Sequence, residues 1–87
     1  MKIALIPNLT RKEAAGVTAG ICQSLKKLGA DFCFTDEYRN EFEHTGAAFL
    51  PENEALDGCD AVIAVGGDGS IIHAAKLAAV RQKPILG

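Results

Sequence analysis

A strongly apolar run, residues 61–65, leads directly into the glycine-rich segment Gly66-Gly67-Asp68-Gly69-Ser70. A continuous run of small and β-branched residues is typical of a strand that is buried on both faces of a parallel sheet. Residues 70–81 then show helical spacing of their apolar side chains. This stretch therefore predicts a strand, a tight glycine turn and a helix, whose apolar face is formed by Ile71, Ala74, Ala75 and Ala78.

The start of the chain predicts a second strand followed by a helix. Residues 2–6 are a short apolar run that ends at Pro7. Thr10 and Glu13 have the spacing of a helix-capping box, and Gly29 suits the left-handed position at a helix end. The spacing predicts a helix over residues 11–28, with a buried face made of Ala14, Thr18, Ile21, Leu25 and Leu28.

The remaining segments complete an alternating order. We expect strands at residues 31–35 and 84–87 and one helical turn over 51–56, whereas the charged stretch 36–50 predicts an irregular surface loop. Strands that alternate with helices of this length imply a parallel sheet with right-handed crossovers. The predicted fold class is therefore α/β, with a Rossmann-like parallel sheet and helices on its faces.

Size and charge exclude several classes of function. A chain of 87 residues suits one small domain. Its net charge of −2 gives no electrostatic reason to bind nucleic acid or an anionic membrane. No apolar run approaches the roughly 18 residues that a membrane span needs. The apolar start of the chain is too short for a signal peptide, so a strand explains it better.

The cysteines indicate a reducing compartment. There are three of them, Cys22, Cys33 and Cys59, without CxxC spacing and in apolar surroundings. An odd number of apolar cysteines argues against a disulfide framework or a zinc site. We therefore expect a cytoplasmic protein.

The glycine-rich segment is the candidate site, because ligands of open α/β sheets bind beyond the carboxyl ends of the strands. Its spacing matches neither the dinucleotide-binding nor the P-loop motif. Gly66, Gly67 and Gly69 allow the backbone to approach an anionic ligand, and the following helix N-terminus favours negative charge. The structural alternative is a tight turn that simply needs glycine. Ser70 is the better helix cap, which leaves Asp68 available to orient a hydroxyl group that receives phosphate.

Other polar residues have more than one interpretation. His73 lies one turn into the helix and neighbours Ser70, although an exposed or core-edge histidine is the commoner outcome. Asn8 could either face the same crevice or cap the first helix. Arg81 is expected to be a solvated cation at a helix end.

Three segments together resemble the bacterial NAD kinase family. They are KIALIPN at residues 2–8, CDAVIAVGGDGSIIHAA at 59–75 and KPILG at 83–87. The glycine motif alone is shared with phosphofructokinases and with diacylglycerol and sphingosine kinases, but the flanking strand, the helix containing His73 and the final strand are closer to NAD kinase.

The resemblance implies a reaction and roles for individual residues. The family transfers the γ-phosphate of ATP, or in some members of polyphosphate, to the 2′-hydroxyl of the adenosine ribose of NAD. By resemblance, Asp68 is the catalytic residue that accepts the proton, and Asp68, Gly69 and His73 lie at NAD. Gly66, Gly67 and Ser70 would shape the phosphate pocket, and Mg²⁺ or another divalent cation would be bound mainly by the donor phosphates.

The resemblance also implies that residues 1–87 are one N-terminal nucleotide- and phosphate-binding domain. The β-rich C-terminal domain of the family has no counterpart here, and the chain stops as it enters a strand, so we expect this piece alone to be inactive. We also expect a homo-oligomer, since uncovered apolar surface favours self-association. The alternatives are a related kinase acting on a lipid or a sugar, or an α/β binding module without catalysis.

Overall fold

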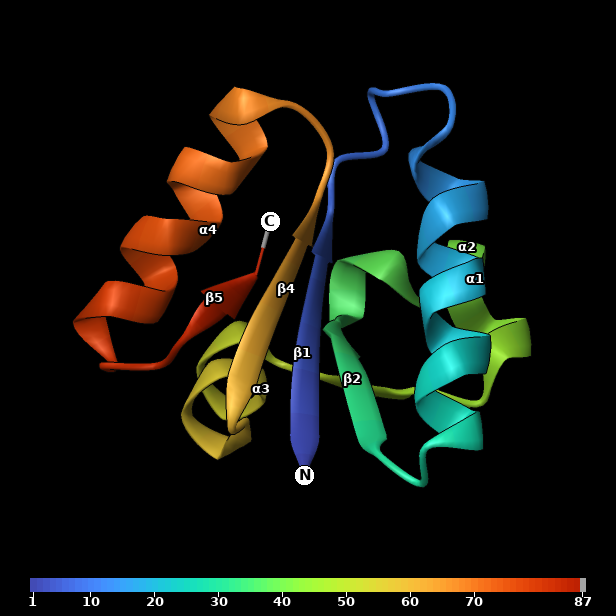
Figure 1. The fold of residues 1–87 in the computed structure, drawn as a ribbon, viewed down its shortest axis with the longest axis horizontal. Helices are drawn as coiled ribbons and strands as arrows, with labels where there is room; N and C mark the ends of the chain where they lie inside the picture. The colour runs from blue at the N-terminus through green and yellow to red at the C-terminus, as the bar shows by residue number, and fades with distance from the viewer. Residues whose placement is uncertain (87) are drawn as a thin grey trace.

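A computed structural model describes residues 1–86 of the chain, apart from the side chains of Asp68 and Ser70. Helices and strands alternate along most of its length (Figure 1). The elements are β1 (Lys2–Pro7), α1 (Ala14–Lys27), β2 (Asp31–Thr35), η1 (Asp36–Tyr38), α2 (Arg39–Phe42), η2 (Glu43–Thr45), β3 (Ala48–Leu50), α3 (Glu52–Gly58), β4 (Ala61–Val65), α4 (Asp68–Val80) and β5 (Ile85–Leu86).

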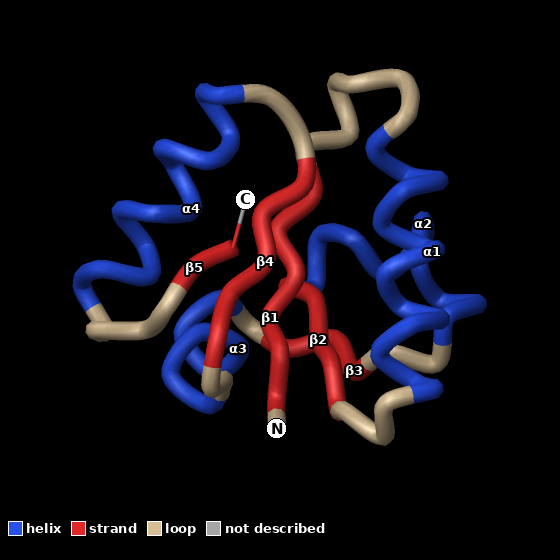
Figure 2. The backbone as a smooth tube through the Cα atoms, in the orientation of Figure 1, coloured by secondary structure: helices blue, strands red, loops and turns tan. Residues whose placement is uncertain are grey.

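The strands form one parallel sheet in the order β3-β2-β1-β4-β5 (Figure 2). From β1 the chain first builds the sheet toward β3, then crosses back to β4 and continues in the opposite direction. The predicted α/β fold with a parallel sheet is therefore confirmed. The order of the strands reverses between β1 and β4, which is the position where such sheets bind ligands.

Successive side chains of β1 enter two different cores. Ile3 and Leu5 pack on the face covered by α1, together with Phe34 of β2. Ala4 packs on the opposite face, in the core that α3 and α4 share. On that second face α4 contributes the fully buried Ala74 and Ala78, small side chains that allow the helix to lie close to the sheet.

The prediction of an irregular loop over residues 36–50 was wrong. The segment contains two 3-10 turns, the short helix α2 and the edge strand β3. Phe42 is 1% exposed and stacks on Phe34 at a centroid distance of 4.5 Å, and Phe49 of β3 lies 5.8 Å from Phe34. Burial of these aromatic side chains orders a segment whose other residues are mostly charged.

The start of α1 also differs from the prediction. Helix α1 begins at Ala14, and no side chain caps it, so the capping box of Thr10 and Glu13 is absent. Its buried face is formed by Ala14, Thr18, Cys22 and Leu25, with Ile21 partly buried.

At its other end, α1 leaves Leu28 80% exposed rather than buried. Gly29 has a φ of 73°, as predicted for the left-handed residue after a helix. Within the described chain, no helix is both long and apolar enough to cross a membrane.

Candidate functional site

The carboxyl ends of β1 and β4 lie level with each other. Pro7 pairs with Val65 in the parallel register, and the Asn8 amide donates a hydrogen bond of 2.8 Å to the Val65 carbonyl. The loops that follow these two strands leave the sheet at adjacent points and then lead to α1 and α4 on opposite sides (Figure 1), and Arg11 of the first loop lines a hollow with Gly66 and Gly67 of the second. The point where the strand order reverses is thus lined by one loop from each half of the sheet.

The glycine turn after β4 has a conformation that its sequence requires. Gly66 has a φ of 143°, which a residue with a Cβ rarely adopts. Gly67 is extended and occupies the N-cap position of α4, and its carbonyl accepts a hydrogen bond from the Ile71 amide at 3.2 Å. The prediction that Ser70 caps this helix was therefore wrong, because α4 already begins at Asp68.

The other two glycines of the turn differ in their surroundings. A Cβ on Gly67 would collide with the guanidinium group of Arg11, whose Cζ would lie only 2.8 Å away. A Cβ on Gly69 would meet nothing within 4 Å among the described atoms. The neighbour of Gly67 is thus the flexible end of an exposed side chain, whereas no described atom lies beside Gly69.

Four of the predicted site residues line a single cavity of about 440 Å³. They are Asn8, Gly67, Gly69 and His73, which come from the loop after β1 and from the first turns of α4. His73 is exposed on its helix. Gly66 lines a neighbouring hollow of about 280 Å³, which also contains Arg11 and Gly67. The predicted roles of the Asp68 and Ser70 side chains fall outside the described part of the structure.

Asn8 borders the cavity, as one of its two predicted interpretations had it, and it does not cap α1, as the other had it. Its side-chain oxygen accepts hydrogen bonds from the Thr10 hydroxyl at 2.6 Å and from the Thr10 amide at 3.2 Å. It therefore stabilises the turn that precedes α1 rather than capping the helix itself, and it also borders the cavity.

Tyr38 closes the cavity on the side of β2. Burial raises the pKa of its phenol, and the nearby carboxylates of Glu37, Glu41 and Glu52 raise it further. The phenol therefore stays protonated and can donate a hydrogen bond. A smaller cavity of about 90 Å³ lies next to it, lined by Tyr38, His73, Glu37 and Glu52. The two cavities together form one crevice. It is cationic at Arg11, in the larger cavity, and acidic beyond Tyr38, in the smaller one.

Comparison with known protein families shows to which family the chain belongs. A sequence profile of the ATP-NAD kinase N-terminal domain matches residues 3–87. The chain belongs to this family.

Individual relatives have the same assignment. The chain is 30% identical to an NAD kinase of Acetivibrio thermocellus over 87 residues, covering 100% of this chain and 30% of that protein. It is 32% identical over 90 residues to an NAD kinase of Methanoculleus marisnigri, and 28% identical over 91 residues to one of Bacteroides fragilis. These matches cover the whole chain and 30% and 31% of the two relatives, so the chain spans about a third of the NAD kinases it resembles. No solved structure matches the chain.

Two residues that line the cavity of about 440 Å³, Arg11 and Tyr38, were missed by the sequence analysis. Arg11 reaches the glycine turn from a loop 56 positions earlier in the chain, and no local pattern marks that contact. Tyr38 follows β2 closely, and β2 ends at the same edge of the sheet as β1 and β4. Its position just after a strand was a usable signal.

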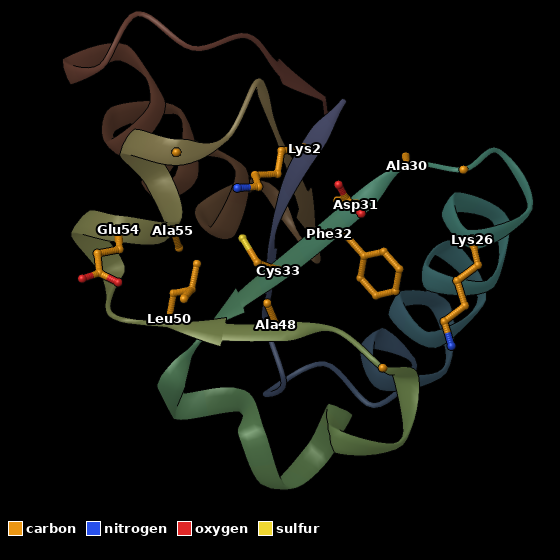
Figure 3. A pocket seen from close by; sticks show the side chains of 13 residues that line it. Lys2, Lys26, Ala30, Asp31, Phe32, Cys33, Ala48, Leu50, Glu54 and Ala55 are labelled. Atoms are coloured by element: carbon orange, nitrogen blue, oxygen red, sulfur yellow. The ribbon is translucent and has the colours of Figure 1, made fainter.

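A larger cavity of about 620 Å³ lies at the opposite edge of the sheet (Figure 3). It borders the first residues of β2, where Asp31 and Phe32 extend beyond the register of β3. Cys33, Leu50 and Ala55 line it on one side and Lys26 on the other (Figure 3). Because ligands of parallel sheets bind at the carboxyl ends of strands, this cavity is not the candidate site.

The described side chains do not form a metal site of their own. Among these side chains, no three His, Cys, Asp or Glu residues come together as a set of metal ligands.

Proposed function

We propose that this chain supplies the glycine-motif half of an NAD kinase, which phosphorylates the 2′-hydroxyl of the adenosine ribose of NAD. The observation that supports it most is the position of the family's glycine turn. The turn lies at the reversal point of the sheet and is followed by the 13-residue helix α4. Amides at the start of such a helix favour the negative charge of phosphate groups.

Asp68 is the proposed catalytic residue. It accepts the proton of the 2′-hydroxyl as that oxygen bonds to the γ-phosphorus of ATP, and the bond from this phosphorus to the β–γ bridging oxygen breaks. NADP and ADP are the products. An aspartate with an ordinary pKa near 3.9 is a weak base, so its main effect is to orient the hydroxyl.

The remaining residues bind and position the substrates. Gly66, Gly67 and Ser70 shape the phosphate pocket, and the open space beside Gly69 lets NAD approach the backbone. His73 and Asn8 border the nucleotide. Mg²⁺ or another divalent cation, bound through the donor phosphates, neutralises part of their charge.

The proposed enzyme is longer than these residues, since the relatives are about three times the length of this chain. We propose that it acts in the cytoplasm as a homo-oligomer. Exposed apolar side chains on this domain, including Leu28, Val80 and Leu86, are consistent with contacts to further protein.

The test uses the natural protein that contains this chain. Incubation with ATP and each of four acceptors, NAD, diacylglycerol, sphingosine and fructose 6-phosphate, should show transfer of phosphate to NAD alone. Asp68→Asn should remove most NADP formation while circular dichroism and the thermal midpoint stay unchanged, because the substitution keeps the shape of the side chain. Labelling of another acceptor, or retained activity in the variant, would contradict the proposal.

A further inference from the structure

The guanidinium group of Arg11 lies against the glycine turn. It occupies the position that a Cβ on Gly67 would need, and Arg11 lines both the cavity of about 440 Å³ and the adjoining hollow of about 280 Å³. Both ion pairs found among the described side chains, Arg39–Asp36 and Arg81–Asp57, lie elsewhere. Glu13 borders the smaller hollow on the side of α1.

Arg11 lies where the N-termini of two helices come close to each other, together with the carboxylate of Glu13. It lies near the N-terminus of α4, whose first residue is Asp68, and three residues before α1, whose N-cap residue is Glu13. The positive ends of two helices of 14 and 13 residues therefore face the same region as this cation. Cations are normally favoured at the opposite end of a helix. Glu13 supplies part of the negative charge that offsets these positive groups, and a bound anion would supply more.

Polarity of the crevice indicates which end the anion occupies. Beyond Tyr38 the lining contains Glu37 and Glu52, which would repel a phosphate chain. At the Arg11 end, a planar guanidinium can bind two phosphate oxygens at once. The acidic end is better suited to uncharged hydroxyl or amine groups.

We infer that Arg11 binds the phosphate chain of the phosphoryl donor and holds its terminal phosphate over Gly67. This inference rests on the proposed function. In-line transfer requires the attacked phosphorus to lie about 3–3.5 Å from the attacking hydroxyl. Gly67 immediately precedes Asp68, the residue proposed to orient that hydroxyl. The Arg11 guanidinium group, which lies against Gly67, would therefore be next to the transferred phosphate. The ligand class is a linear phosphate chain, supplied either by a nucleoside triphosphate or by inorganic polyphosphate.

Three variants of the natural protein test the inference. Arg11→Gln should lower kcat/KM for the donor by roughly 10- to 100-fold, the factor expected for loss of a charge-assisted bond, and leave the KM for NAD within about twofold. Inorganic tripolyphosphate, used as a competitive inhibitor, should lose affinity by a similar factor. Arg11→Lys should recover part of both losses, because it restores the charge without the fork. Lys12→Gln removes a neighbouring exposed charge and should change neither value.

A separate variant tests the position of the Arg11 guanidinium group against Gly67. Gly67→Ser keeps a favourable N-cap residue but adds a Cβ where the guanidinium lies, so it should reproduce the loss seen in Arg11→Gln. The double variant should lose little more than either single variant. Fully additive losses would show that Arg11 does not act through this position.

The donors are compared separately. If the unmodified protein uses both ATP and polyphosphate, an equal loss with each identifies the shared phosphate chain, whereas a loss with ATP alone would overturn the inference. An unchanged donor kcat/KM, or an equal rise in the KM for NAD, would also overturn it while leaving the proposed function intact. An unmodified protein that makes no NADP from either donor would remove both.

Discussion

The Asn8 amide and the Val65 carbonyl are joined by a hydrogen bond of 2.8 Å, which ties the ends of β1 and β4 together where the strand order reverses. Asn8 is also fixed from its other side, because its side-chain oxygen accepts two hydrogen bonds from Thr10. The loop that contains Arg11 is therefore held in a defined position next to the glycine turn. A site assembled from two separate loops depends on this link.

The first prediction separates two glycines of the turn. Gly66→Ala should destabilise the protein by about 1–3 kcal/mol, because its φ of 143° strains any residue with a Cβ. Gly69→Ala should leave the thermal midpoint unchanged or raise it slightly, since its Cβ meets no described atom within 4 Å.

Activity gives the matching measurement for this pair. Under the proposed function, Gly69→Ala should still lose most NADP formation, because the methyl group occupies the space through which NAD approaches. A Gly69→Ala protein with full activity would show that this space is not part of the substrate site.

The second prediction concerns the aromatic contact beneath α1. Phe42→Ala should lower the free energy of unfolding by about 3–5 kcal/mol, since it leaves a cavity beside Phe34, which is fully buried. Asn40→Ala, an exposed change in the same short helix, is the control and should cost much less. Equal losses from denaturant unfolding of the two variants would contradict the packing described here.

The third prediction concerns Arg81, which is not the solvated cation that its sequence position predicts. Its side chain is 17% exposed and donates hydrogen bonds to Asp57 at 2.7 Å, Asn53 at 3.0 Å and the Leu77 carbonyl at 3.1 Å. It therefore ties the end of α4 to α3.

Arg81→Ala should cost roughly 1–2 kcal/mol, a modest value because Asp57 is largely exposed and water screens the pair. Arg81→Lys should recover only part of the loss, because an ammonium group cannot reach all three acceptors. Thermal midpoints of the two variants measure this difference, and identical midpoints would argue that charge alone matters.

The fourth prediction is a loss of stability in alkaline solution. Burial raises the pKa of the Cys22, Cys33 and Cys59 thiols above the ordinary value of 9.0. Above about pH 9 the unfolded chain releases these protons while the folded chain keeps them, so the free energy of unfolding falls as the pH rises. The thermal midpoint should therefore decrease between pH 8 and pH 10.

A variant separates the thiols from other groups that titrate in this range. Cys33→Ala should weaken the pH dependence, whatever its effect on the midpoint at pH 8. A slope that is the same with and without Cys33 would mean that this thiol does not contribute.

The sequence was sufficient to predict the parallel α/β fold because the decisive segments have strong patterns. The apolar run of β4, the helical spacing in α4 and the glycine that ends α1 each depend on local physics. The edge strand β3 escaped prediction because it has only three residues, none of them fully buried. Phe42 orders its segment through contacts with β2 and α1 that no local pattern encodes.

The same distinction holds for the site. Asn8, Gly67, Gly69 and His73 were predicted, since each follows a predicted strand or begins a predicted helix, and they line one cavity. Arg11 was not, because its contact with Gly67 joins two loops and depends on the register of β1 with β4.

That register has a consequence for the tolerance of the chain to length changes. Ile3 and Leu5 fill the core under α1, whereas Ala4 lies in the tightly packed core under α4. Deleting one residue within β1 would send bulky side chains toward Ala74 and Ala78 and would also withdraw Asn8 from Val65. The strand β1 therefore does not tolerate insertions or deletions. Changes in the length of this chain during its evolution are expected in the loops instead.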